Sequence, residues 1–271
     1  MDLFFMISGF LIGKILLNSR DQRDYYTVFY SKRIARIFPL AFVMFLCGII
    51  LALVLGWNLT SLPYYFLFIQ NYIPTQDVVG TDPQWTGHLP GLNTMWSLAV
   101  EEHFYLVTPF LIMKLRGVGL PIVLFILSLV SVILKVKYIN SHVSYTFFSN
   151  PFPTECRVVY LASGMMMNFE RSRKKYLGVM ILLWITVDYI AESNFGKLDV
   201  IAFSTLWLLV VATIDQRLRF RCYPLAWIGI RCYGIYLIHM PITLVLKRFG
   251  GDLHPLILMS ILIISTLILA E

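Results

Sequence analysis

The sequence predicts an all-α fold: a polytopic bundle of about nine transmembrane helices with one short re-entrant or interfacial segment. The first reason is composition, because 58% of the 271 residues are hydrophobic, only 14% are charged and the mean hydropathy is +0.75. Soluble domains are about 45–50% apolar and about 25% charged, so this composition excludes an ordinary soluble protein. The second reason is that apolar residues gather in runs near the length of about 20 residues that a spanning helix needs.

No polar segment is long enough to fold separately, so residues 1–271 are expected to form a single integral-membrane domain. The predicted spans cover residues 2–17, 38–56, 94–113, 118–134, 155–169, 177–191, 199–214, 224–246 and 255–270. A further apolar piece, Leu62–Ile73, is too short to cross a membrane and contains Pro63, Gln70 and Asn71. We expect this piece to be re-entrant or interfacial.

Lysine and arginine predict the orientation of the helices. The loops 18–37, 170–176 and 215–222 are rich in both, so all three are expected on the cytoplasmic side. The three loops can lie on the same side only if Leu62–Ile73 does not cross the membrane. Under this topology Lys135 and Lys137 lie on the outer side, which the distribution of positive charge does not favour. Because these loops carry much of the positive charge, the net charge of +7 indicates topology, and no nucleic-acid partner is expected.

The predicted span 94–113 contains two carboxylates and an imidazole, Glu101, Glu102 and His103. A charge inside a membrane helix costs about 2.5–3.5 kcal/mol on insertion scales, so such residues usually have a function. Helical spacing places Glu101 on one stripe with three other polar side chains, Ser97, Tyr105 and Thr108. We therefore expect Glu101 to face the bundle interior, and His103 to face lipid or pack between helices.

Three other places carry candidate site residues. Arg33 and Arg36 share a helix face at the entrance to the span 38–56, where Pro39 suits a first helical turn. They could bind a phosphate bidentately or only anchor the helix, and both interpretations stay open. Arg157 could likewise contact substrate or snorkel to the interface.

Late in the chain, His239 follows Tyr236 by about one turn in an apolar helix. A lone His in such a helix is more often structural than catalytic, and substrate contact is the alternative. The four cysteines have no metal-ligand spacing, so we interpret them as small apolar residues and expect no metal site.

Together these segments resemble the acyltransferase family 3 membrane proteins. Asp2–Phe10 is similar to the family's D-L-F-F-x-x-S-G-F, and Arg33–Pro39 to its R-x-x-R-I-x-P. Trp96–Leu106 is similar to W-S-L-x-V-E-x-x-F-Y-L, the most specific of the matches. Gly229–His239 resembles G-x-x-S-Y-x-x-Y-L-x-H with Cys in place of Ser, and Arg157 is a looser match.

The chain departs from the family in one respect. Members normally begin with a further transmembrane helix whose Arg and His form an R-x10-H pattern, and that His is taken as catalytic. None of the five histidines here lies in an equivalent position. We therefore expect a domain truncated at its N-terminus and short at its C-terminus.

The resemblance implies an O-acyltransferase of the bacterial inner (cell) membrane that transfers an acyl group to a hydroxyl of a cell-surface or lipid-linked carbohydrate. It implies no bound cofactor, with acyl-CoA, expected to be acetyl-CoA, as co-substrate. Glu101 would be catalytic, Arg33 and Arg36 would bind the acyl-CoA phosphates, and Arg157, Tyr236 and His239 would contact substrate.

Two other interpretations remain. The chain could be an inactive, truncated member of the family, or a carrier that moves a polar solute past Glu101. Carriers usually show paired half-repeats with broken helices. The sequence has no such repeat, so transport ranks last.

Overall fold

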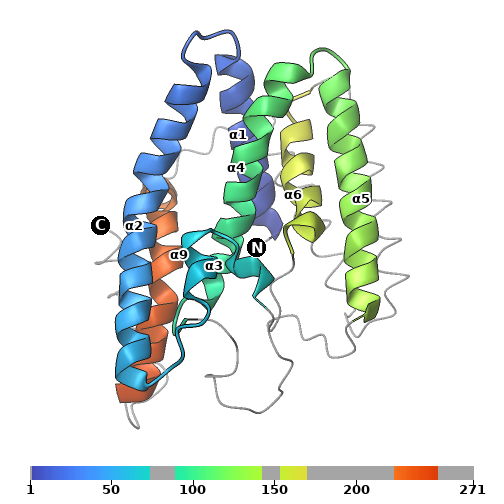
Figure 1. Cartoon of the computed structure of the whole chain (residues 1–271). Coiled ribbons are helices and arrows are strands. Elements are labelled where there is room, and N and C mark those ends of the chain that lie inside the picture. The colour runs from blue at the N-terminus through green and yellow to red at the C-terminus, as the bar shows by residue number, and fades with distance from the viewer. Residues whose placement is uncertain (1, 74–88, 142–152, 170–222, 250–271) are drawn as a thin grey trace. The chain divides into compact units, whose positions relative to one another are not determined.

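The computed structural model describes residues 2–73, 89–141, 153–169 and 223–249, and every regular element in these ranges is helical (Figure 1). The predicted all-α fold is therefore confirmed for this part of the chain. The elements are α1 (Asp2–Ser19), α2 (Tyr25–Leu55), α3 (Leu62–Phe66), η1 (Gln70–Tyr72), η3 (Asn93–Met95), α4 (Trp96–Lys114), α5 (Gly119–Ser141), α6 (Thr154–Met166) and α9 (Tyr223–Phe249). The predicted spans 177–191, 199–214 and 255–270 lie outside the described residues.

The chain divides into two compact units. The first unit comprises residues 1–27 and 100–219, and the second comprises residues 28–99 and 220–271. Helices α2 and α4 each contribute residues to both units. Each unit is described by itself.

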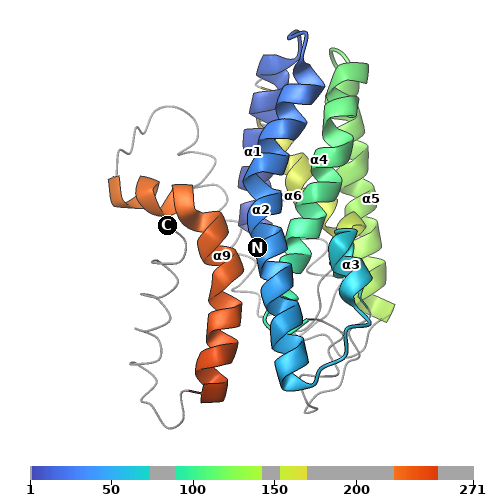
Figure 2. The same cartoon turned by 60° about the vertical axis from the view of Figure 1, so that its left-hand side comes forward.

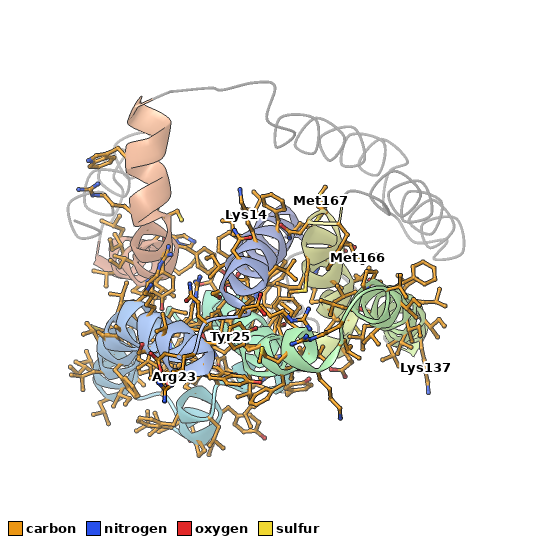
Figure 3. All side chains as sticks on the ribbon, turned by 90° about the horizontal axis from the view of Figure 1, so that it is seen from above. Lys14, Arg23, Tyr25, Lys137, Met166 and Met167 are labelled. Atoms are coloured by element: carbon orange, nitrogen blue, oxygen red, sulfur yellow. The ribbon has the colours of Figure 1, made fainter. Side chains whose placement is uncertain are left out.

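In the first unit, α1 and α6 pack against each other at backbone distance, and Figure 3 shows them side by side near the labels of Lys14 and Met166. A Cβ atom on Gly9 would overlap the carbonyl group of Leu161. A Cβ atom on Gly164 would likewise overlap the carbonyl of Met6. Small residues that let two backbones approach are the usual way in which membrane helices pack, since lipid gives no hydrophobic drive between them.

The turn between α1 and α2 meets the end of α4, also within the first unit. The Arg20 guanidinium donates to the carbonyl oxygens of Met113, at 3.3 Å, and Leu115, at 2.9 Å. These carbonyls are near the helix end, where intrahelical donors run out, so Arg20 caps α4. The Tyr25 hydroxyl donates to the Pro109 carbonyl at 3.3 Å. Figure 1 shows the α1–α2 and α4–α5 turns at the same end.

This contact fixes the direction of the helices. Both α1 and α4 end at the same end of the first unit. Helix α6 runs parallel to α1, because Gly9 meets Leu161 whereas Gly13, one turn later, meets Met165. In the second unit, the segment Leu62–Ile73 forms only the short helices α3 and η1, and its re-entrant or interfacial placement stays a prediction.

In the second unit, the short elements are held by a buried tyrosine. The Tyr65 hydroxyl accepts the Leu89 N–H at 3.2 Å and donates to the Leu92 carbonyl at 3.5 Å. Gly48 of α2 is in contact with Leu92, which brings the loop before η3 onto that helix. The Tyr65 ring packs edge-on against Phe45, with ring centroids 5.6 Å apart. Tyr65 thus ties α3 to α2 and to the loop before η3.

Helix α9 lies beside α2 in the second unit, as Figures 1 and 2 both show. The Tyr233 hydroxyl donates to the Ile37 carbonyl at 3.1 Å. Gly91 approaches α9 so closely that a Cβ atom there would lie 2.8 Å from the Pro241 Cα. Its φ of +75° is in the left-handed region, so both space and backbone conformation favour glycine at this position.

The prediction that a helix begins near residue 38, with Pro39 in its first turn, is wrong. Helix α2 begins at Tyr25 and continues to Leu55, with Pro39 in its interior. Hydropathy detects only the part of a helix that lipid would surround. The preceding turns keep their backbone hydrogen bonds regardless, and they bury Tyr25, Phe29 and Ile37 along one face.

By length and composition, α2 is the one described helix that is both long and apolar enough to cross a membrane. Three shorter apolar helical stretches, Phe4–Ser19, Gly119–Leu134 and Arg231–Leu246, accompany it. The number of nine spans therefore stays a prediction.

Candidate functional site

The polar stripe of α4 is buried, as its spacing predicted. Glu101 is 7% exposed and Tyr105 is 4% exposed, whereas Leu106 next to Tyr105 is 61% exposed. Ser97 and Thr108 are also buried, and Glu102 is half-buried. Glu101 therefore has the interior position that a catalytic carboxylate needs to be shielded from bulk water.

Tyr105 joins two of the motifs. Its hydroxyl lies 2.8 Å from the hydroxyl of Ser8 on α1. Ser8 belongs to the segment D-L-F-F-M-I-S-G-F, and Tyr105 belongs to the segment that contains Glu101. The first unit thus brings the two motifs together one helical turn after Glu101.

His103 lies between helices, which confirms one of the two arrangements expected for it. Its Nδ1 atom is 2.6 Å from the Thr154 hydroxyl of α6. This contact fixes the first turn of α6 against α4. His103 is therefore explained as a packing residue.

The interpretation of Arg157 as a snorkelling residue is wrong. Arg157 is only 8% exposed, and its guanidinium carbon lies 5.8 Å from the centre of the Tyr160 ring. Helix α6 is covered by α1 on one side and by α5 on another, where the Val159 N–H donates to the Ser131 hydroxyl at 3.1 Å. These neighbours help to enclose α6, and the Arg157 side chain is buried with it. Arg157 thus puts a buried cation in the unit that holds Glu101.

The second unit holds Tyr236 and His239. The Tyr236 hydroxyl donates to the Thr94 carbonyl at 2.6 Å and lies 2.8 Å from the Ser97 hydroxyl. It therefore ties α9 to η3 and to the first turn of α4. The His239 Nδ1 atom is 2.6 Å from the Tyr236 carbonyl. Because a carbonyl can only accept, Nδ1 is the donor in this contact.

Arg33 and Arg36 lie on α2 in the second unit and differ in exposure. Arg33 is half-buried, and its guanidinium carbon lies 5.8 Å from the centre of the Phe29 ring. Arg36 is exposed. A half-buried Arg oriented by an aromatic ring beside an exposed one is compatible with phosphate binding and with helix anchoring alike.

Two structural features were not among the predictions from the sequence. Gly9 and Gly13 form a G-x-x-x-G pattern on α1, and this pattern was a readable signal for close helix packing. The complete burial of Gln70 had no signal in the sequence, because it depends on contacts with residues distant in the chain. Among the described residues there is no group of three or more His, Cys, Asp or Glu that could hold a metal.

Comparison with known proteins gives consistent matches. A family model described as an acyltransferase domain matches residues 1–270. An O-acetyltransferase OatA of Staphylococcus aureus is 26% identical over 313 residues, covering 100% of this chain and 50% of the relative. A peptidoglycan O-acetyltransferase OatA of Listeria monocytogenes is 28% identical over 315 residues, covering 100% of this chain and 49% of the relative. The chain thus spans about half the length of these relatives. No solved structure matches it.

Proposed function

The chain belongs to acyltransferase family 3, whose acyltransferase-domain model covers residues 1–270, and we propose that it is an integral-membrane O-acetyltransferase acting on a cell-wall carbohydrate. The observation that carries this proposal is the buried Glu101, on a motif that a hydrogen bond joins to the Ser8 motif. The relative named as a peptidoglycan O-acetyltransferase favours peptidoglycan as the acceptor and acetyl as the transferred group.

The surface of the described helices supports a membrane location. Large apolar side chains are exposed along four helices, among them Leu11 and Ile15 of α1, Leu53 and Val54 of α2, Leu106 and Phe110 of α4, and Ile126 and Ile133 of α5. Water-soluble monomers rarely expose such continuous apolar surface. We propose a single multi-pass domain of about nine spans in the bacterial cell membrane, with the basic α1–α2 turn on the cytoplasmic side.

The donor in this proposal is acetyl-CoA. Its phosphates would bind Arg33 and Arg36, which lie near the predicted cytoplasmic end of α2. Guanidinium groups bind phosphate oxygens through paired, charge-assisted hydrogen bonds, so this position suits a ligand that arrives from the cytoplasm.

The chemical step is acyl transfer. A sugar hydroxyl oxygen attacks the thioester carbonyl carbon, the hydroxyl proton passes to a base, and the C–S bond breaks to release CoA as a thiolate that takes up a proton. This step requires a proton acceptor and donors for the oxyanion. We propose that Glu101 accepts or orients the proton, and that Arg157, Tyr236 and His239 contact the substrates.

The proposal is tested by incubating membranes that contain the chain with radiolabelled acetyl-CoA and peptidoglycan. O-Acetyl esters are cleaved by mild alkali, so the expected product is label that stays on the glycan and is released by base. Membranes without the chain are the control. Absence of alkali-labile label above that control would contradict the proposed function.

A further inference from the structure

Gln70 has a fully buried side-chain amide, and its oxygen atom makes no hydrogen bond within the described residues. It lies in η1 of the second unit and has 0% exposure. Its Nε2 atom donates to the Met95 carbonyl at 2.8 Å. Because a carbonyl accepts only, this bond fixes which end of the amide is nitrogen. The Oε1 atom then has no hydrogen-bond partner among the described residues.

A second buried polar atom without a partner belongs to Thr94, the residue before Met95. The Thr94 Oγ1 atom is inaccessible to solvent and makes no hydrogen bond within the described part of the chain. The backbone carbonyl of Thr94, in contrast, accepts from Tyr236 at 2.6 Å and from Ser97 at 3.3 Å. The backbone of η3 is therefore held in place, while the buried Thr94 hydroxyl makes no hydrogen bond within the described residues.

Such atoms are uncommon and costly. The large majority of buried polar side-chain atoms have a partner, and an acceptor removed from water without one costs free energy. Here two occur in segments that meet, because the Gln70 amide donates to the carbonyl of Met95, the residue after Thr94. That bond holds the Gln70 side chain, and Tyr236 holds the Thr94 backbone. That arrangement suits a site whose missing partners are supplied by a ligand.

The chemistry of the two atoms defines the ligand. Gln70 Oε1 can only accept, and Thr94 Oγ1 can donate or accept. Neither carries charge, so the pair suits a neutral group that both donates and accepts, such as a sugar hydroxyl or an acetamido group, and not a phosphate. We propose that Gln70 and Thr94 form a subsite for a neutral sugar ring of the acceptor.

This subsite rests on the proposed function, and it agrees with the proposed topology. Helix α2 leads away from the basic α1–α2 turn, and η1 and η3 both come after its far end in the chain. With that turn on the cytoplasmic side, the two short elements follow the outer end of α2. An acceptor in the cell wall would approach from there.

The test measures binding and transfer separately on the purified full chain. The probe is the N-acetylglucosamine–N-acetylmuramic acid disaccharide, titrated by calorimetry. Thr94→Val and Gln70→Leu are each expected to raise its Kd about tenfold, the effect of losing one hydrogen bond. Thr94→Ser, which keeps the hydroxyl, and Ser61→Ala, which alters another buried polar residue of the same unit, should leave the Kd unchanged.

Transfer kinetics give the second readout. The acceptor KM should rise in Thr94→Val while the KM for acetyl-CoA stays at the wild-type value. Gln70→Leu also removes the hydrogen bond to the Met95 carbonyl and could prevent folding for that reason. In that case Thr94→Val alone tests the subsite. Wild-type affinity in Thr94→Val, a wild-type chain that does not bind the disaccharide, or an equal rise in both KM values would overturn the subsite. Weakened binding in the variants, with no transfer by any form, would retain the subsite and refute the proposed function.

Discussion

The hydroxyl groups of Ser8 and Tyr105 lie 2.8 Å apart and form a hydrogen bond between α1 and α4. Tyr105 is 4% exposed and Ser8 is half-buried, so this bond is partly shielded from solvent. It fixes α4 one turn after Glu101, and it joins two motifs that are distant in the sequence. Ser8 and Tyr105 help to position the Glu101 carboxylate, so changes to them should affect both stability and catalysis.

The Ser8–Tyr105 bond should appear as coupling in a double-mutant cycle. Ser8→Ala, Tyr105→Phe and the double variant are unfolded in detergent, and the free energies of unfolding are compared. Hydrogen bonds between membrane helices couple by about 0.6 kcal/mol on average and up to about 1.7 kcal/mol, so a value in that range is expected. Strict additivity of the two single changes would mean that the bond does not form.

The contact between α1 and α6 should tolerate no side chain at Gly9. Gly9→Ala is expected to lower the free energy of unfolding by about 1–3 kcal/mol, because the new Cβ meets the Leu161 backbone rather than a flexible side chain. Gly229→Ala is the control, since nothing lies within 4 Å of its added Cβ in α9. That change should be neutral or stabilising, because Ala favours a helix over Gly. Equal losses at both positions would contradict close packing of α1 and α6.

Tyr65 should make the chain sensitive to alkaline pH. Burial raises the pKa of its hydroxyl above the ordinary range. Because the folded pKa exceeds the unfolded value of about 10, Tyr65 contributes its full stability below that pH and loses it as the pH rises further. Tyr65→Phe should therefore reduce the fall in unfolding temperature between about pH 9 and 11. The exposed Tyr72, changed to Phe, is the control, and an unaltered pH profile in Tyr65→Phe would contradict a buried hydroxyl.

The arginines of α2 should bind the acyl donor. Arg33→Ala combined with Arg36→Ala is expected to weaken acetyl-CoA binding by at least about tenfold, while membrane insertion stays intact. Arg23→Ala combined with Lys32→Ala is the matched control, because it removes the same charge from exposed positions nearby. Titration calorimetry distinguishes the two pairs. Equal affinities in both would reduce Arg33 and Arg36 to anchors of the helix.

Local periodicity predicted some features well. The spacing of polar residues in α4 correctly placed Glu101 on the buried face. The residues that share one face of a helix can be identified from their spacing in the sequence.

Features that depend on distant contacts could not be predicted in this way. Arg157 is buried because α1 and α5 cover α6, and no local pattern reveals that cover. The start of α2 at Tyr25 was not predicted, because hydropathy indicates which residues suit lipid contact and says nothing about backbone hydrogen bonding. The close approach at Gly9 and the unpartnered oxygen of Gln70 depend likewise on segments far apart in the chain.

The most direct test compares Glu101→Gln with Glu102→Gln in the peptidoglycan acetylation assay. The two residues are adjacent, but Glu101 lies on the buried stripe and Glu102 is half-buried beside it. Glu101→Gln keeps the shape and removes the basicity, so acetyl transfer should fall by at least about a hundredfold, the scale of general acid–base catalysis. Glu102→Gln should transfer acetyl at close to the wild-type rate. Normal acetylation by Glu101→Gln would contradict the central role of this carboxylate.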